Sequence, residues 1–554
     1  MSHIQFPYRG MNTRRQHSSS DNSDFVTGTS HNSIERGQEG HEPDSTDIEA
    51  GAGRTESGIG SRDDGVGTTA LPAILEALAG RRPARTPVWF MRQAGRSLPE
   101  YRALRECAGI PMLEACLDPE LAAEATLQPV RRHGVDAAVL FSDIMVPLRL
   151  AGVGVRIEEG VGPVLDAPVR SASEVSELVA RRLGDETGTE RTAGAVGSAG
   201  SAGTEGAAGV AAIEEAVRRV VVELGSPQLP GVHEGLSQRA HTGLEHSAGA
   251  AGWTPLLAFG GAPFTLAAYL VEGRPSRDHL AARTLMRSDP DSWDRLMTWC
   301  ARLTGEFIAI QVRAGAAAAQ LFDSWAGSLS PRTYREQVAP YSGLALETAR
   351  GALSPTTGQA PPLIHFGTGT ARLLGLMRQG ADAVGIDERI EIGEAIEALA
   401  VADPQAGACP VQGNLDPALL AAPWPLVAEE VDAVLAAGRA APGHVVNLGH
   451  GVPPATDADV LTRIVARVHG SADWEAVSLA GWDAVAETRP GAAEGRATDT
   501  GAGAGSGSHE AAQTAAGGRS VGRQDQRAPG RQAPRGPGGR PLARTSRRPG
   551  REDR

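Results

Sequence analysis

Eight short apolar runs recur between about residues 70 and 480 of this 554-residue chain, and each ends in glycine or polar residues. They are continuously apolar and do not alternate in polarity, which is typical of parallel strands covered on both faces. In order, the runs are "TPVWFM", "AAVLFSD", "PLLAFGG", "AAAQLFD", "PLIHFG", "DAVGID", "CPVQGN" and "HVVNLGHG". Helical patterns separate most of them. The alternation predicts an α/β fold class, a single (β/α)8 TIM barrel, with a doubly wound open sheet as the alternative.

Three of the intervening helices carry the same start signal, a capping residue followed by proline. They are "DPELAAEATLQPVRRHG", opening at Asp118, "SPRTYREQVAPYSGLALETARG", opening at Ser330, and "DPALLAAPWPLVAEEVDAVLAAG", opening at Asp416. We expect each to form one helix between two strands.

Composition divides the chain into three parts. Residues 1–68 are polar with almost no apolar periodicity, and residues 481–554 are rich in Arg, Gly and Pro, so both are expected to be disordered tails. Residues 69–480 would form the barrel, interrupted by flexible low-complexity insertions at about 184–210 and 226–252. The Arg-rich end fits either a solvated tail or a polyanion-binding segment.

Charge and hydropathy narrow the class of protein. The formal net charge of −13 argues against general binding to nucleic acid or a membrane surface. No stretch approaches the ~20 apolar residues of a membrane helix, and the N-terminus lacks an apolar secretory segment. The four cysteines form no C-x-x-C pair and are interpreted as free thiols. We therefore expect a cytoplasmic protein.

Two arginines four residues apart follow the first apolar run directly. Arg92 and Arg96 flank Gln93-Ala94-Gly95, and a guanidinium is a planar, permanently charged donor suited to carboxylates. In a barrel of this kind the site lies at the carboxyl ends of the strands, so both would project over its mouth. The pattern fits an anion clamp, with surface salt bridges as the alternative.

Other strands also end in polar groups that would converge at the same mouth. A carboxylate at Asp143 fits either stabilisation of a developing cation or the cap of a helix over "DIMVPLRL". Tyr269 fits a core or a ligand role, Ser324 fits a cap or a ligand contact, and His450 lies in a loop between glycines. The remaining polar strand ends are His365, Asp387 and Asn414.

The sequence lacks the motifs of several common classes of enzyme and metal site. There is no Walker A pattern and no G-x-S-x-G elbow, and "GTGTARLLG" is a weak phosphate loop. Zinc would need a His/Cys cluster, whereas His365 is followed by Phe366-Gly367 and Cys409 lies alone. No metal site is predicted.

The chain resembles the uroporphyrinogen decarboxylase family of the haem pathway across roughly residues 70–470. The resemblance is carried by "PVWFMRQAGRSLPEYRALR", "FSDIMVP", "FGGAPFTLAAYLVEG", "LFDSWAG", "HFGTGT", "VQGNLDP" and "NLGHGVPPATD". It implies a (β/α)8 barrel, a homodimer, and no metal or organic cofactor. The implied reaction removes the carboxyl groups of four acetate side chains from uroporphyrinogen III, giving coproporphyrinogen III and four carbon dioxide molecules.

The resemblance also implies roles for the site residues. Arg92, Gln93, Ala94, Gly95 and Arg96 would form the substrate-binding loop. Asp143 would face the pyrrole N–H groups and stabilise the protonated pyrrole, with Arg92 and Arg96 orienting carboxylates during catalysis. Tyr269, Ser324 and His450 would contact the substrate.

The sequence departs from the family in one motif. Where the family usually has aspartate followed by tryptophan, this chain has Asp387-Glu388, which puts the packing or substrate contacts at that strand end in doubt. The 226–252 insertion should enter at the amino end of the strand "PLLAFGG", away from the site.

Two other functions remain: a corrinoid-linked methyltransferase of the same barrel superfamily, and a non-catalytic porphyrinogen-binding protein.

Overall fold

The computed structural model describes residues 71–184, 202–227, 252–405 and 407–470. The predicted tails at 1–68 and 481–554 lie outside the described residues, as do 185–201 and 228–251, most of the two predicted insertions. Among the described residues, no helix has the length and apolar character that crossing a membrane requires.

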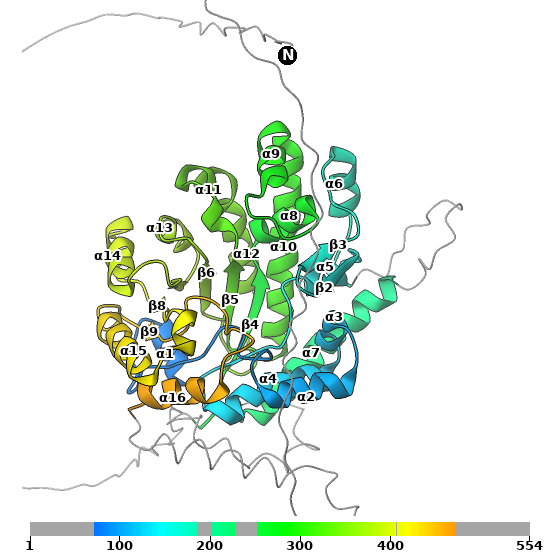
Figure 1. Cartoon of the computed structure of the whole chain (residues 1–554). Helices are drawn as coiled ribbons and strands as arrows, with labels where there is room; N and C mark the ends of the chain where they lie inside the picture. Colours follow the sequence, from blue (N-terminus) through cyan, green and yellow to red (C-terminus); the bar gives the residue numbers. More distant parts are fainter. Residues whose placement is uncertain (1–70, 185–201, 228–251, 406, 471–554) are drawn as a thin grey trace, which may run out of the picture. The chain divides into compact units, whose positions relative to one another are not determined.

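A seven-stranded parallel sheet forms the centre of the described part (Figure 1). Its strands, in spatial order, are β1 (Ala138–Val139), β4 (Leu256–Gly261), β5 (Ala318–Asp323), β6 (Leu363–Gly367), β7 (Ala383–Gly385), β8 (Val411–Gln412) and β9 (His444–Val445). Spatial order follows chain order throughout. The doubly wound alternative is therefore wrong, because such a sheet reverses its strand order at a switch point.

The sheet is strongly curled. Gln412 on β8 donates through Nε2 to Gln320 Oε1 on β5, at 2.8 Å. Three strand spacings separate β5 from β8, which is about 14 Å in a flat sheet. The side chains meet because the sheet bends around its apolar interior, where the Trp89 indole also donates to Gln412 Oε1 at 3.0 Å.

The first predicted strand forms only a single bridge. Val88 pairs in parallel with Val446, just after β9, and Val446 N donates to Pro87 O. On its other side, Val88 O accepts from Asp136 N, just before β1, at 2.8 Å. Residues 87–89 thus hydrogen-bond to the segments at both ends of the strand order.

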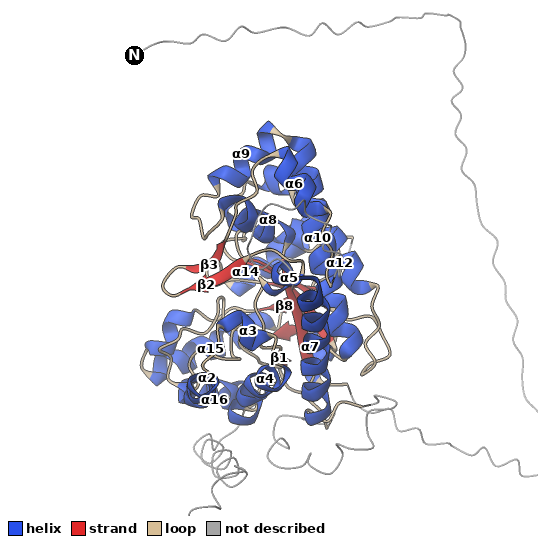
Figure 2. Cartoon of the chain, turned by 90° about the vertical axis from the view of Figure 1, so that its right-hand side faces the viewer, coloured by secondary structure: helices blue, strands red, loops and turns tan. Residues whose placement is uncertain are grey.

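A small antiparallel hairpin, β2 (Val155–Glu158) with β3 (Gly162–Leu165), lies outside the main sheet and was not expected from the sequence. Helices surround the strands of the main sheet (Figure 2). They are α1 (Ala73–Leu78), α2 (Pro99–Ala108), α3 (Met112–Cys116), α4 (Pro119–His133), α5 (Val146–Leu150), α6 (Ala172–Val179), α7 (Ala202–Glu223), α8 (Pro263–Glu272), α9 (Leu280–Ser288), α10 (Pro290–Ala314), α11 (Pro331–Gln337), α12 (Ala339–Arg350), α13 (Leu374–Met377), α14 (Ile392–Ala402), α15 (Trp424–Gly438) and α16 (Ala458–Val468), with short 3-10 turns η2 (Ala326–Ser328) and η3 (Pro417–Ala421).

The predicted helix starts are confirmed, but two of the helices are divided. Asp118 caps α4 by accepting from Glu120 N and Leu121 N. The helix that begins after Ser330 breaks at Val338, because Pro340 starts a new helix, α12. Likewise η3 ends before Pro423, and α15 begins just after it. Proline in the first turn suits a helix start and disfavours continuation from the preceding turn.

The predicted flexible insertion at 184–210 is wrong for its last residues. Helix α7 begins at Ala202, and Gly206 and Gly209 lie against Leu150. A Cβ added at Gly206 would lie 2.8 Å from Leu150 O, and one at Gly209 would lie 2.4 Å from Leu150 Cδ2. The low-complexity composition therefore serves close helix packing there.

Trp89→Phe should lower the free energy of unfolding by about 1–3 kcal/mol, because it leaves Gln412 Oε1 unpaired in the interior. Urea denaturation measures the loss. Trp299→Phe is the control, since its indole bonds to Arg181 O nearer the surface, at 2.9 Å. Equal losses in the two variants would contradict a special cost for the interior hydrogen bond.

Candidate active site

The loop after the first apolar run, residues 92–96, is anchored to the protein interior by the Gln93 side chain. This side chain is 2% exposed, accepts from Phe90 N at 2.9 Å and donates to Ala137 O at 2.9 Å. Met91 is held in the same way, since its N–H donates to Asn447 Oδ1 and its carbonyl accepts from Val452 N. Gln93 therefore anchors the loop to the interior, and its side chain does not reach the solvent-exposed side of the loop.

Both arginines of this loop adopt the left-handed backbone conformation, with φ of 63° at Arg92 and 51° at Arg96. Gly95 between them has φ of 100°, and its Cα faces the ring of Tyr101. Non-glycine residues in this conformation are strained and concentrate at functional sites. Within the described residues, no hydrogen bond or ion pair engages either guanidinium, so both remain available to a ligand.

Asp143 follows β1, and its side chain and carbonyl both take part in the turn that leads into α5. Its Oδ1 accepts from Met145 N at 2.8 Å, and its carbonyl accepts from Val146 N at the start of α5. This turn fixes the orientation of the carboxylate. Among the described residues nothing donates to Oδ2, which leaves that oxygen for a ligand. Burial raises the pKa of Asp143, opposed by the Met145 N–H and the Arg92 charge.

Tyr269, on α8, lies in a stack of three rings. Its ring centroid is 3.9 Å from that of Trp325, which also stacks with His279 at 4.4 Å. Trp325 directly follows Ser324, the predicted contact at the end of β5. Burial, with the nearby Asp143 carboxylate, raises the pKa of Tyr269, so its hydroxyl keeps its proton.

Arg92 is the common neighbour that brings three predicted site residues together. Its charge lowers the pKa of Asp143, of Tyr269 and of His450, in each case alongside a larger effect of burial. Its side chain also covers Gly451, where an added Cβ would lie 2.5 Å from Arg92 Cδ. Arg96 follows Arg92 in the loop and is half-buried, but no described contact joins it to this cluster.

Three other polar residues at strand ends have structural roles, contrary to the expectation that they project over the mouth. His365 lies buried within β6, with Nδ1 3.0 Å from Met377 O. Asp387 is 1% exposed and accepts from Gly369 N at 2.5 Å. Asn414 donates to the carbonyls of Asp387 and Ile390. These side chains hold the loops that surround the site.

Two rings of the aromatic stack, Trp325 and His279, were not among the site residues predicted from the sequence. Trp325 stood in the quoted "LFDSWAG" segment, where an aromatic residue beside a polar strand end was a usable signal. His279 had no such signal, because it lies 10 residues beyond Tyr269 in a loop and only the tertiary structure brings it onto Trp325. It is 3% exposed and has a left-handed backbone, φ 48°.

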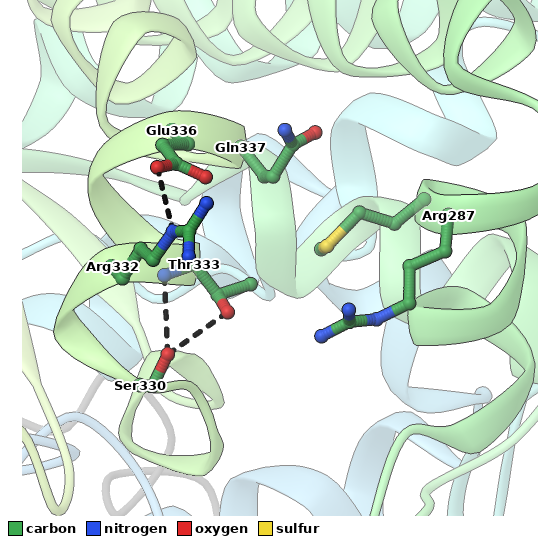
Figure 3. Close-up of a pocket in the computed structure, with 7 residues that line it drawn as sticks. Arg287, Ser330, Arg332, Thr333, Glu336 and Gln337 are labelled. Atoms are coloured by element: carbon green, nitrogen blue, oxygen red, sulfur yellow. Dashed lines mark hydrogen bonds and ion pairs between the residues drawn. The ribbon is translucent and has the colours of Figure 1, made fainter. Parts of the chain in front are cut away.

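Among the described residues, no group of three or more His, Cys, Asp or Glu side chains is arranged to hold a metal ion. A cavity of about 600 Å³ lies between α9 and α11 (Figure 3). Two pairs of its lining residues hydrogen-bond to each other, Ser330 with Thr333 and Arg332 with Glu336, and no predicted site residue lines it.

Comparison with known proteins gives one consistent match. The sequence model of the family described as "Uroporphyrinogen decarboxylase (URO-D)" matches residues 69–196 and 244–471. A uroporphyrinogen decarboxylase of Arthrobacter sp. (strain FB24) is 49% identical over 404 residues, covering 73% of this chain and 98% of that protein. The Leifsonia xyli subsp. xyli enzyme of the same name is 48% identical over 414 residues, covering 73% and 96%.

A solved structure is also similar in fold. A methyltransferase from Methanosarcina mazei matches with a TM-score of 0.50 and 16% identity, covering 72% of this chain and 97% of that chain. At this identity the likeness concerns the fold alone.

Proposed function

Since the chain belongs to the uroporphyrinogen decarboxylase family, we infer that it is a carboxy-lyase of tetrapyrrole biosynthesis. It removes the carboxyl groups of the four acetate side chains of uroporphyrinogen III, giving coproporphyrinogen III and four carbon dioxide molecules. The observation that carries the site assignment is that the Arg92 charge acts on Asp143, Tyr269 and His450, while the Arg92 side chain packs against Gly451 beside the histidine.

The fold we propose is a closed (β/α)8 barrel in which residues 87–89 form the eighth strand. The hydrogen bonds of Val88 and its neighbours to Val446 on one side and Asp136 on the other support this closure. Closure would place Arg92 and Asp143 on the same rim, because parallel strands present their carboxyl ends together.

The substrate carries eight carboxylates, and the arginines match this charge. Arg92 and Arg96 have unpaired guanidiniums within the described residues, and each can donate two parallel hydrogen bonds to a carboxylate. The protein as a whole is acidic, so positive charge concentrated in one loop is what would draw a polyanion to the site. Gln93 contributes indirectly, by fixing the strained loop.

Asp143 is proposed to stabilise the charge that develops during decarboxylation. Protonation of a pyrrole carbon creates a cationic ring, which accepts the electron pair released when the bond to carbon dioxide breaks. The Asp143 carboxylate, held by Met145 N–H at one oxygen, would present the other to the pyrrole N–H groups. A fixed charge of this kind is typically worth about 3–4 kcal/mol.

Tyr269, Ser324 and His450 complete the proposed site as substrate contacts. The Tyr269 hydroxyl keeps its proton because burial raises its pKa, so it can donate to a substrate carboxylate. The stack on Trp325 restricts the orientation of the tyrosine ring. Arginine is a reluctant general acid because of its high pKa, so Arg92 and Arg96 orient carboxylates and the proton donor is another group.

The test of this function uses the purified protein and uroporphyrinogen III under anaerobic conditions, without added metal or cofactor. The expected products carry seven, six, five and finally four carboxyl groups. Methyl transfer that requires zinc and a corrinoid would favour the methyltransferase, and binding without turnover would favour the non-catalytic porphyrinogen-binding protein. Either result would overturn the proposal.

We also propose that the protein is a homodimer and that it is cytoplasmic. Sedimentation tests the homodimer, and cell fractionation tests the location.

The acid side of the pH–rate profile should depend on Arg92. Asp143 acts as an anion, so kcat should fall as pH drops through its pKa, which burial raises above that of an ordinary aspartate. Arg92 opposes this rise, so Arg92→Ala should move the acid limb to higher pH. Arg332→Ala, on the exposed face of α11, is the control that should leave the limb in place. A limb that stays or moves to lower pH in Arg92→Ala would refute the coupling.

A further inference from the structure

Glu388 follows β7 and carries a carboxylate oxygen that the fold leaves without a partner. Its side chain is 19% exposed, and Oε2 is buried with no hydrogen bond in the described part of the chain. The other oxygen lies 3.6 Å from Arg389 Nε, on a side chain that is 60% exposed. A buried carboxylate oxygen without a donor is costly, which indicates a role beyond packing.

The neighbour of this carboxylate is the loop that carries His450. Gly449 and Gly451 flank the histidine, and each is covered by a charged side chain. A Cβ added at Gly449 would lie 2.6 Å from Glu388 Oε2, and one at Gly451 would lie 2.5 Å from Arg92 Cδ. The backbone on the two sides of His450 is therefore packed against a carboxylate and a guanidinium side chain that follow two other strands.

The charges facing His450 act in opposite directions. Burial lowers the pKa of His450, and the charges of Arg92 and Arg389 lower it further. The Glu388 carboxylate opposes them, together with a hydrogen bond involving the Gly451 backbone. Of the charged groups that act on this imidazole in the described part of the chain, Glu388 is the one that favours its protonated form.

We propose that Glu388 is a positioning residue that keeps His450 oriented and able to hold a proton, so that His450 supplies the proton that replaces each lost carboxyl group. This inference rests on the proposed decarboxylase function. When the bond to carbon dioxide breaks, its electron pair forms a double bond from the methylene carbon to the pyrrole ring. The imidazolium N–H proton then adds to that methylene carbon, completing a methyl group, and the proton first added to the pyrrole carbon leaves to water, which restores the neutral pyrrole. The neutral imidazole regains a proton from water, because His450 is exposed to solvent.

The first test reads the protonation of His450 without any turnover. Histidine-labelled full-length protein is titrated by NMR, with His450→Gln identifying the resonance. Glu388→Gln should shift the His450 titration to lower pH, and Glu388→Asp should restore part of the shift. Glu391→Gln removes an exposed carboxylate three residues away and should leave the titration unchanged. An unchanged His450 titration in Glu388→Gln would overturn the proposal.

The second test separates this inference from the proposed function. Decarboxylation of uroporphyrinogen III by Glu388→Gln should show a lower kcat with KM nearly unchanged, and the loss should be smaller at acid pH, where the imidazole is protonated without help. A raised KM with constant kcat would instead make Glu388 a packing or binding residue. If the wild-type protein shows no decarboxylation, the proposed function fails, whereas the NMR titration still decides whether Glu388 controls His450.

Discussion

Asp143→Ala is expected to lower kcat for uroporphyrinogen III by about 10²- to 10³-fold, the equivalent of the 3–4 kcal/mol that one preorganised charge contributes. The effect should fall on kcat because the carboxylate meets its full partner, the cationic ring, only as the reaction proceeds. Steady-state kinetics under anaerobic conditions, with products separated by carboxyl number, provides the measurement.

Asp143→Asn is the matched variant for this prediction. The amide keeps the size of the side chain and an oxygen that can accept from Met145 N–H, now at 2.8 Å from Oδ1, but it carries no charge. It should therefore fold like the wild type and lose nearly as much activity as alanine. If Asp143→Asn keeps near-normal coproporphyrinogen production, the carboxylate serves the turn before α5 and not the reaction.

Arg92→Ala is expected to lower kcat/KM by about 10²-fold, because truncating one member of a desolvated charge pair typically costs about 2–5 kcal/mol. Most of the loss in kcat/KM should appear in KM if the guanidinium binds a substrate carboxylate that is not the one being removed. Isothermal titration of the anaerobic protein with coproporphyrinogen III would give the corresponding loss in affinity.

Two controls sharpen this second prediction. Arg92→Lys keeps the charge but lacks the planar pair of donors, so it should recover only part of the affinity. Arg332→Ala removes an arginine that is 82% exposed and paired with Glu336, and it should bind as the wild type does. If Arg92→Ala binds coproporphyrinogen III as tightly as Arg332→Ala does, the loop is not the carboxylate clamp.

Most of the sheet could be predicted from the sequence because its strands are continuous apolar runs of the kind that parallel sheets require. The run at 86–91 was the partial exception, since Val88 makes a single bridge and the bonds of its neighbours replace a regular ladder. Helix boundaries were less predictable. Pro340 and Pro423 were visible signals for the breaks they cause, whereas the Gly- and Ala-rich start of α7 looked like an insertion. Composition cannot distinguish a flexible glycine from one, such as Gly206, that allows two backbones to approach.

The sequence predicted which residues follow the strands. It did not predict which of their side chains point toward the candidate site and which point into the interior. Arg92, Asp143 and His450 follow their strands, and the charge of Arg92 acts on both of the other side chains. Gln93 and His365 also follow or end apolar runs, yet both are buried and bonded to backbone. The difference depends on which face of the chain meets the interior, and a single residue shift reverses that face.

The most direct test is the structure of the protein crystallised anaerobically with coproporphyrinogen III. We expect the free oxygen of Asp143 within hydrogen-bonding distance of the pyrrole nitrogens, and the Arg92 guanidinium on a carboxylate at the rim of the macrocycle. A complex in which the Asp143 carboxylate points away from the nitrogens, or in which Arg92 is paired with a protein group instead of the ligand, would contradict the account.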